Sequence, residues 1–243
     1  MNLSEIFVLP ILHILIGFVF GIILTFVKSK LPSKLRWNLR DYADTKFIIA
    51  TSISIKTNTY IKQATGLGQV YAIGRLLSSF FKAYSAKKDP QIYFSENTNE
   101  NDLKSNLVVI GGVKHNSISK SILEKCPNLP YTQVTQDNID IIIDRRRHQS
   151  IYGLLEEGVL KDDFGLIISI PNPYNPDRRA LIFLSVHTFG LDAAAEVFTK
   201  ELTMGKNLFN KNYVCLVKCK VESKNITEPE ILDFVKLKNG QWK

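Results

Sequence analysis

The stretch Leu107-Val108-Val109-Ile110-Gly111-Gly112 is the most informative one for the fold of this chain. Four successive apolar residues are typical of a strand that is buried on both faces, and the two glycines after them permit a tight turn. Apolar residues then recur at helical spacing between Ile118 and Leu123. The segment therefore predicts a strand, a glycine-bearing loop and a helix in succession.

The same order of features occurs twice more. A predicted strand over residues 46–55 precedes a polar loop that ends in Thr65-Gly66-Leu67-Gly68-Gln69, and apolar residues follow at helical spacing. A predicted strand over 180–186 precedes His187-Thr188-Phe189-Gly190 and an alanine-rich helix over 191–202. Three strand-to-helix units predict an α/β fold with a parallel or mixed sheet sandwiched by helices.

Other apolar runs predict the strands that complete this sheet. Residues 164–170 are expected to pair with 180–186 across a proline-rich turn at 171–176. The C-terminal strand pair is expected at 213–221 and 231–237. Further short strands are expected at 91–95, 131–135 and 139–143.

Ligands of open α/β sheets bind at the carboxyl ends of the strands, where helix amino termini present unpaired N–H groups. The predicted ligand is therefore anionic, and a nucleotide-derived molecule fits best. The expected ligand-binding residues come from the three loops and the proline-rich turn: Thr65, Gly66, Gly68, Gln69, Gly111, Gly112, His115, Asn116, Asn172, His187, Thr188 and Gly190. In the alternative interpretation the glycines only make tight turns, the histidines meet no ligand, and Asn172 belongs to a rigid turn. If the strand at 164–170 runs antiparallel in the sheet, this turn lies away from the edge formed by the carboxyl ends of the other strands.

Neither glycine loop carries a complete cofactor signature. Tyr71 stands where a G-x-G-x-x-G loop would have its third glycine, and the chain contains no G-x-x-x-x-G-K-[ST] sequence. We therefore expect no obligatory cofactor beyond the nucleotide-derived ligand. The three cysteines, Cys126, Cys215 and Cys219, show no metal-ligand spacing, so we also expect no metal site.

Three segments together resemble the Rossmann-like nucleotide-handling superfamily: 65–69, Gly111-Gly112 with Asn116, and Gly190-Leu191-Asp192-Ala193-Ala194. That grouping includes TIR domains, SLOG domains and nucleoside deoxyribosyltransferases, which occur in bacterial immunity and nucleotide signalling. The resemblance covers residues 46–202 and rests on the order of the elements. It implies a sensor of a nucleotide-derived signal in antiviral defence, or cleavage of an N-glycosidic bond by an acidic residue.

Asp192 and Glu196 are the candidate acidic residues for such a reaction. They lie four residues apart at the start of the third helix, so both project from one face. A carboxylate there could serve as nucleophile or general base in glycosidic cleavage. The favoured alternative is that both residues simply offset the dipole of the helix.

An uncharged apolar run over residues 6–27 precedes the predicted domain, and five basic residues follow it within 28–40. A helix of that length crosses the roughly 30 Å hydrocarbon layer of a bilayer. A signal peptide would need a basic start and a cleavage site, which this run lacks. We therefore expect a transmembrane anchor at 1–30, a basic juxtamembrane linker at 31–45 and a Rossmann-like α/β domain at 46–243. The basic flank predicts a single-pass protein of the cell inner membrane, with the N-terminus outside and the C-terminal domain cytoplasmic.

Small and polar residues recur every four positions along the apolar run, at His13, Gly17, Gly21 and Thr25. Such a stripe lets two helices approach closely and form hydrogen bonds, which predicts a homo-oligomer. Glycine is also common in membrane helices, so a chance G-x-x-x-G match remains the alternative.

The net charge of +8 does not by itself indicate a nucleic-acid partner. Much of the excess lies beside the apolar run, where anionic lipid headgroups account for it. The run Arg145-Arg146-Arg147-His148 is dense enough to bind phosphate, although a solvated loop is the favoured interpretation. No nucleic-acid-binding module is recognisable, so we expect no sequence-specific nucleic-acid partner.

Three functions agree with these features. The main one is a membrane-anchored receptor that binds a nucleotide-type small molecule and transmits this signal to the lipid bilayer by oligomerisation. The second is a membrane-bound nucleotide N-glycosidase or transferase. The third is a membrane tether for a protein partner, without a small-molecule ligand.

Overall fold

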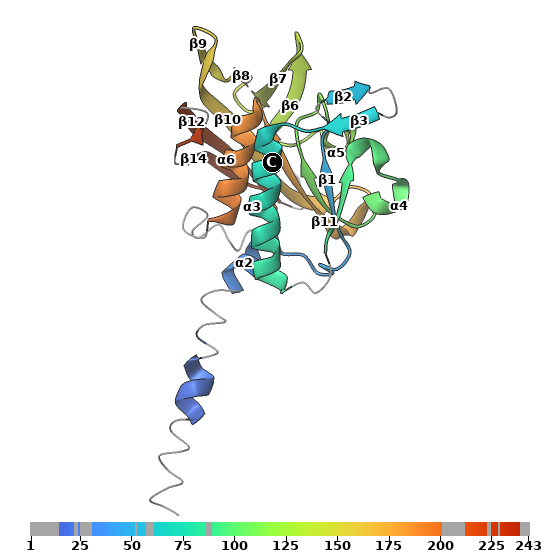
Figure 1. Cartoon of the computed structure of the whole chain (residues 1–243). Helices are drawn as coiled ribbons and strands as arrows, with labels where there is room; N and C mark the ends of the chain where they lie inside the picture. Colours follow the sequence, from blue (N-terminus) through green and yellow to red (C-terminus); the bar gives the residue numbers. More distant parts are fainter. Residues whose placement is uncertain are drawn as a thin grey trace, which may run out of the picture.

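A computed structural model of the chain describes residues 15–21, 24, 31–51, 53–56, 61–85, 89–200, 212–222, 225–227 and 229–238. These residues form an α/β fold around one curled, mixed sheet (Figure 1). The predicted α/β class with a mixed sheet is therefore confirmed.

Four parallel strands form one half of the sheet, in the spatial order β4 (Gln91–Phe94), β1 (Thr45–Ile49), β5 (Asn106–Ile110) and β11 (Asn175–Ser185). Beyond β11 the strands alternate in direction. The members of this antiparallel half are β10 (Val159–Asn172), β12 (Tyr213–Glu222) and β14 (Glu230–Lys236), with the short strands β9 (Leu154–Glu156) and β13 (Asn225–Ile226). The carboxyl ends of β1, β5 and β11 lie together at the upper edge in Figure 1.

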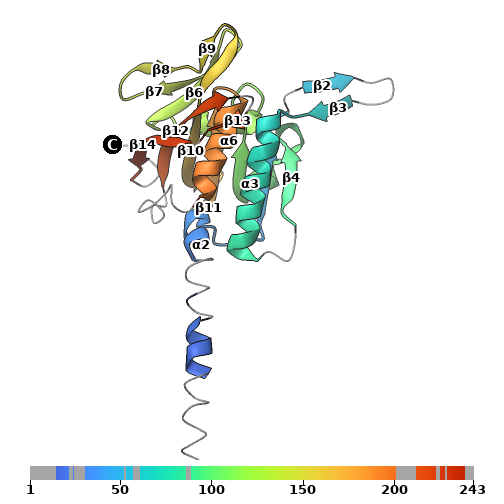
Figure 2. The same ribbon diagram turned by 60° about the vertical axis from the view of Figure 1, so that its left-hand side comes forward.

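The two faces of the sheet are covered differently. Helices α3 (Leu67–Tyr84) and α6 (Thr188–Thr199) lie side by side on one face (Figures 1 and 2). The other face carries α5 (Ser117–Lys125) and a three-stranded sheet of β6 (Tyr131–Gln136), β7 (Ile139–Asp144) and β8 (Gln149–Ile151). Every residue of β5 is buried, as its unbroken apolar run predicts, because both of its faces are covered.

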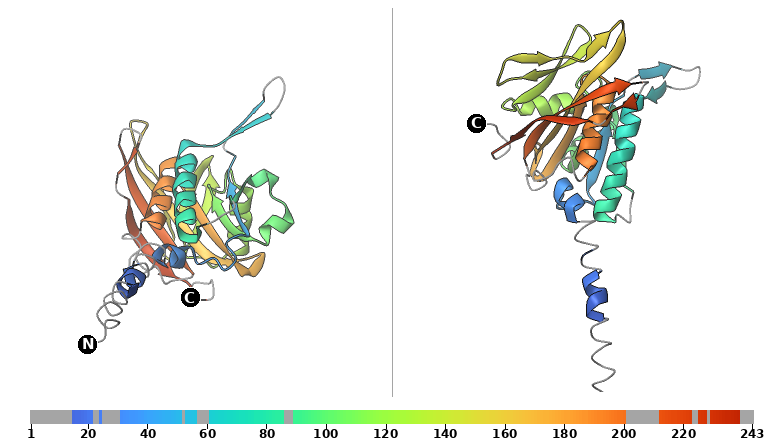
Figure 3. Two further views of the ribbon diagram at one scale, coloured as in Figure 1. Left: turned by 60° about the horizontal axis from the view of Figure 1, so that its bottom comes forward. Right: turned by 90° about the vertical axis from the view of Figure 1, so that its left-hand side faces the viewer.

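A short helix, α2 (Leu31–Trp37), lies in the segment that was expected to be a linker. Trp37 is fully buried, and its ring packs edge-on against Phe80 and Phe198. Its indole nitrogen donates a hydrogen bond to the hydroxyl of Ser79, at 3.1 Å. This segment therefore belongs to the core beneath α3 and α6 (Figure 3, right).

The strand expected over 46–55 is divided into two elements. β1 ends at Ile49, and β2 (Ile53–Lys56) pairs with β3 (Ile61–Ala64) in a hairpin that projects from the body (Figures 2 and 3). The backbone N–H groups of Ala50 and Thr51 donate to the carbonyls of Ile110 and His115, which hold the chain against the loop after β5. Beyond Thr51 the chain no longer pairs with the main sheet and enters the β2–β3 hairpin. The remaining described elements are a 3-10 turn (Ser95–Asn97) and α4 (Glu100–Leu103), between β4 and β5.

The predicted transmembrane anchor at 1–30 is wrong by the criterion of helix length and hydropathy. Within the part of the chain that the structure describes, no helix is both long enough and apolar enough to cross a membrane. The membrane-anchored form of the fold class and the single-pass inner-membrane localisation are corrected accordingly.

Candidate functional site

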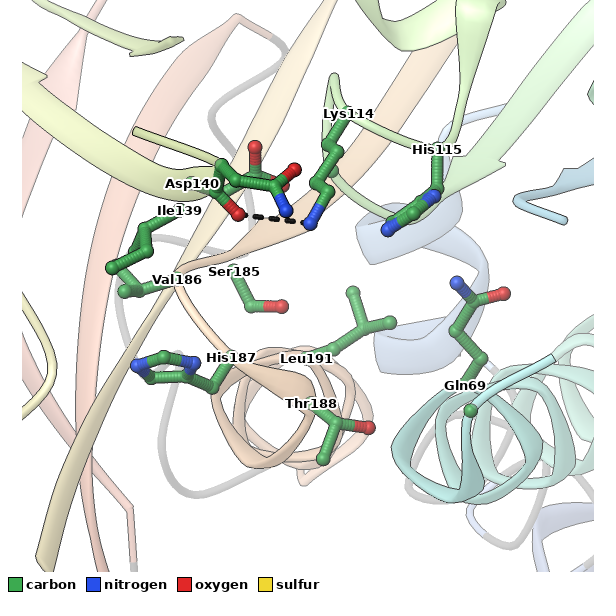
Figure 4. A pocket seen from close by; sticks show the side chains of 14 residues that line it. Gln69, Lys114, His115, Ile139, Asp140, Ser185, Val186, His187, Thr188 and Leu191 are labelled. Carbon is green, nitrogen blue, oxygen red and sulfur yellow. Dashed lines mark hydrogen bonds between the residues drawn. The ribbon is translucent and has the colours of Figure 1, made fainter. Parts of the chain in front are cut away.

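A cavity of about 240 Å³ opens at the edge of the sheet where the predicted ligand site lies. We call it the carboxyl-edge cavity. It is built from the loops after β5 and β11, the start of α3 and the start of β7 (Figure 4). Its lining residues are Gly66, Gln69, Gly111, Gly112, Lys114, His115, Asn138, Ile139, Asp140, Ser185, Val186, His187, Thr188 and Leu191.

Gly111 and Gly112 both need the absence of a side chain, for different reasons. Gly111 has a φ of +115°, and a Cβ there would lie 2.6 Å from the Cβ of Ala50. Gly112 faces the small sheet, where a Cβ would lie 2.2 Å from a carboxylate oxygen of Asp140. The predicted loop therefore keeps one wall of the cavity open while the backbone packs against its neighbours.

At the start of α3, two of the predicted residues line the cavity and two support it. Gly66 and the largely buried Gln69 contribute to the wall. The hydroxyl of Thr65 donates to the side-chain oxygen of Gln69. Gly68 instead packs against α6, because its N–H donates to the hydroxyl of Thr188 at 2.9 Å and a Cβ would lie 1.9 Å from the Thr188 carbonyl oxygen.

Asp163 on β10 holds the amino terminus of α6 at the cavity. Its carboxylate is fully buried and accepts hydrogen bonds from the backbone N–H groups of His187 at 3.0 Å and Gly190 at 2.6 Å. Burial raises its pKa, which these hydrogen bonds and the charge of His187 oppose. Gly190 also lies against β10, since a Cβ there would be 2.2 Å from the Phe164 carbonyl oxygen. Of the predicted residues in this loop, His187 and Thr188 therefore line the cavity, whereas Gly190 packs behind it.

Three basic side chains and one carboxylate give the cavity its charge: Lys114, His115, His187 and Asp140. Lys114 donates through its ammonium group to the carbonyl of Asn138, at 2.8 Å (Figure 4). Burial raises the pKa of Asp140, although a hydrogen bond from Thr135 and the charges of His115 and Lys114 act in the opposite direction. The cavity therefore combines one lysine and two histidines with one carboxylate that gains a proton more readily than usual.

Two of the predicted ligand-binding residues have structural roles. Asn116 is fully buried and caps α5, because its side-chain oxygen accepts from the N–H groups of Ile118 and Ser119. Asn172 is also fully buried, and its amide donates to the carbonyls of Leu103 and Ser105. β10 runs antiparallel to β11, so Asn172 lies at the edge of the sheet opposite the cavity.

Asp192 and Glu196, the predicted catalytic pair, connect two helices. Both contact Arg75 of α3, at 2.6 Å for Asp192 and 2.9 Å for Glu196. Glu196 also pairs with Lys200, at 2.6 Å. Neither carboxylate lines the carboxyl-edge cavity, because both lie farther along the α3–α6 contact. Asp192 and Glu196 do project from one face of α6, as predicted, but that face is directed towards Arg75 and not towards the cavity.

The arginine run after β7 is mainly part of the scaffold. Arg146 pairs with Asp144 at 3.1 Å and with Asp233 of β14, and its guanidinium lies over the ring of Tyr131. Arg147 is 70% exposed and lies 4.0 Å from Asp144. The central arginine of the run thus joins the small sheet to the main sheet.

The predicted oligomer stripe is only partly within the described residues. His13 and Thr25 lie outside them. A Cβ at Gly17 or Gly21 would meet nothing within 4 Å, so both have open space around them. The stripe therefore remains a prediction. Among the described residues, no group of three or more His, Cys, Asp or Glu side chains is arranged to hold a metal ion.

The sequence did not reveal the importance of Lys114, Asp140 and Asp163. Lys114 lies two residues after the glycine pair, and this position was an available signal. Asp140 lies on the small sheet and Asp163 on an antiparallel strand, so only the folded chain brings them to this edge.

No model of a known protein family matches the chain, and no curated protein matches it.

Proposed function

We propose that this α/β domain binds a nucleotide-type anion in the carboxyl-edge cavity. The observation that carries the proposal is the convergence of glycine-rich backbone and basic side chains on one cavity: Gly66, Gly111, Gly112, Lys114, His115 and His187. The starts of α3 and α6 lie at the same edge, where the helix dipoles favour negative charge, although the buried carboxylate of Asp163 already accepts from the Gly190 N–H of α6. Ile139, Val186 and Leu191 add an apolar wall that suits a base.

Ligand retention tests this proposal. The purified full chain is incubated with an equimolar mixture of the common nucleotides and nucleosides, and native mass spectrometry identifies what stays bound. We expect nucleotides to be retained and nucleosides to be lost, because the phosphate would supply the charge-assisted contacts. Lys114→Gln should weaken retention about tenfold, the loss expected for one such contact. Lys125→Gln on α5, whose side chain lines a different cavity, is the control. Equal retention of nucleosides would contradict the proposal.

A nucleotide N-glycosidase is the second candidate, and Asp140 is the observation that favours it. Its carboxylate is in the cavity, its pKa is raised by burial, and His115 is close enough to affect its charge. Such a pair suits acid–base chemistry at a glycosidic bond. Free base released from a nucleotide by the wild type, and not by Asp140→Asn, would support this candidate. Intact ligand after prolonged incubation would contradict it.

A further inference from the structure

A second cavity lies beside the carboxyl-edge cavity and is lined in part by residues of α5. It has a volume of about 530 Å³, and we call it the α5 cavity. Lys114 lines both cavities. Between them stands Gln133, which accepts from the N–H of Val113 at 3.1 Å and donates to the carbonyl of Ser185 at 2.7 Å. The two cavities are therefore neighbours, and Lys114 belongs to the wall of both.

The α5 cavity is basic. Lys114, Lys120 and Arg145 line it, against the single carboxylate of Glu124. Lys114 and Lys120 are exposed, and within the described residues none of the three cations has a carboxylate within 4.0 Å. Lys114 and Arg145 donate to the main-chain carbonyls of Asn138 and Pro127, which leave their positive charges unneutralised and able to attract a ligand that carries negative charge.

The volumes of the two cavities favour a ligand that uses both. Sites for small molecules usually measure roughly 300–1,000 Å³. At about 240 Å³ the carboxyl-edge cavity is below that range, whereas the two cavities together are well inside it. A mononucleotide would fill the first cavity and leave the cations of the second unused.

We propose that the ligand is a dinucleotide-type molecule, whose second phosphate lies in the α5 cavity against Lys120 and Arg145. Its first phosphate and sugar occupy the carboxyl-edge cavity, and Lys114 lies between the two phosphates. This inference rests on the proposed nucleotide binding and specifies the class of ligand. A sugar separates the two phosphates, so a nucleoside polyphosphate, with adjacent phosphates, does not span both cavities.

Competition between ligand mixtures tests this inference. The full chain is offered an equimolar mixture of all 5′-phosphorylated dinucleotides of the common bases, alongside their mononucleotides and triphosphates. Native mass spectrometry reads retention, and titration of the retained species gives Kd. We expect the dinucleotide to bind about tenfold more tightly than the mononucleotide, since one charge-assisted contact contributes about that factor. Lys120→Gln should remove most of this preference. Lys125→Gln, the same change of charge on the same helix, should leave it intact.

Three results of this experiment would contradict the dinucleotide inference, and a fourth would contradict nucleotide binding itself. Equal retention of mononucleotides and dinucleotides would overturn the inference and leave the proposed nucleotide binding in place. A triphosphate that binds as tightly as the dinucleotide would also overturn it. So would a dinucleotide preference that Lys120→Gln and Lys125→Gln affect equally. Retention of no nucleotide at all would refute the proposed function itself.

Discussion

At the scale of single residues, Gly68 sets how closely α3 approaches α6. Gly68→Ala would place a methyl group 1.9 Å from the carbonyl oxygen of Thr188, which is backbone and cannot rotate away. The helices would have to separate, so we expect the free energy of unfolding to fall by about 2 kcal/mol, a typical cost of overpacking. Denaturation by urea measures this change.

Gly74 in the same helix is the matched control. A Cβ there meets nothing within 4 Å, and the position is exposed. Gly74→Ala should therefore raise the free energy of unfolding by about 1 kcal/mol, because alanine favours the helix more than glycine does. Opposite signs for two identical substitutions in one helix would show that the α3–α6 contact causes the loss at Gly68. A loss at both positions would contradict that explanation.

At the scale of elements, α6 depends on Asp163 for its amino terminus. Asp163→Asn keeps the size of the side chain but replaces one of the two acceptor oxygens with an NH₂ donor. In either orientation of the amide, this NH₂ group would face the N–H of His187 or the N–H of Gly190. One buried N–H group would lose its partner, and we expect a loss of about 2 kcal/mol in unfolding free energy. Hydrogen exchange should be faster at the first turn of α6 than in β5. Unchanged exchange at this turn would contradict the capping role.

A second element-scale prediction concerns the attachment of the small sheet to β14. Burial would raise the pKa values of Asp144 and Asp233, but hydrogen bonds and the charge of Arg146 outweigh it, so both pKa values are below normal. As the pH falls, the unfolded chain therefore takes up protons before the native one. The stabilising contribution is complete at neutral pH and is lost as the pH falls from about 4 through the native pKa values.

Arg146→Gln tests this linkage. At pH 7 it should lower the free energy of unfolding by about 2 kcal/mol, somewhat less than the loss of a fully buried pair, because the Arg146 side chain is 22% exposed. The difference from the wild type should shrink as the pH is lowered to 3, measured by urea denaturation across that range. Arg147→Gln, with a 70% exposed side chain, should stay within about 0.5 kcal/mol at every pH. A difference that grows in acid would contradict the assigned ion pairs.

At the scale of the whole molecule, short sequence patterns were enough to predict which edge of the sheet holds the cavity. The apolar run before Gly111 and the glycines before α3 indicate strand-to-helix junctions, and such junctions meet at one edge of a parallel sheet. The direction of β10 was not determined by local sequence. Because it is antiparallel, Asn172 lies at the far edge, and its buried amide bonds belong to the scaffold.

Contacts between distant segments account for the other differences. Asp192 and Glu196 have the spacing of a catalytic pair, but Arg75, distant in sequence, meets both of them. Asp140 reaches the cavity only because the small sheet packs beside the loop after β5. The apolar run at the amino end illustrates a different limit, since hydropathy alone predicted a spanning helix that the described residues do not contain.

The segment before β1 provides a whole-molecule test of where the folded unit begins. Trp37 is fully buried among Phe47, Phe80 and Phe198, and it donates a hydrogen bond to Ser79. Trp37→Ala should therefore lower the free energy of unfolding by about 4 kcal/mol, the usual loss for a large aromatic side chain in a core. A chain that begins at residue 31 should unfold cooperatively at the temperature of the full chain, whereas one that begins at 46 should not, as thermal denaturation would record. Equal unfolding temperatures for the two truncated chains would show that the core forms without α2.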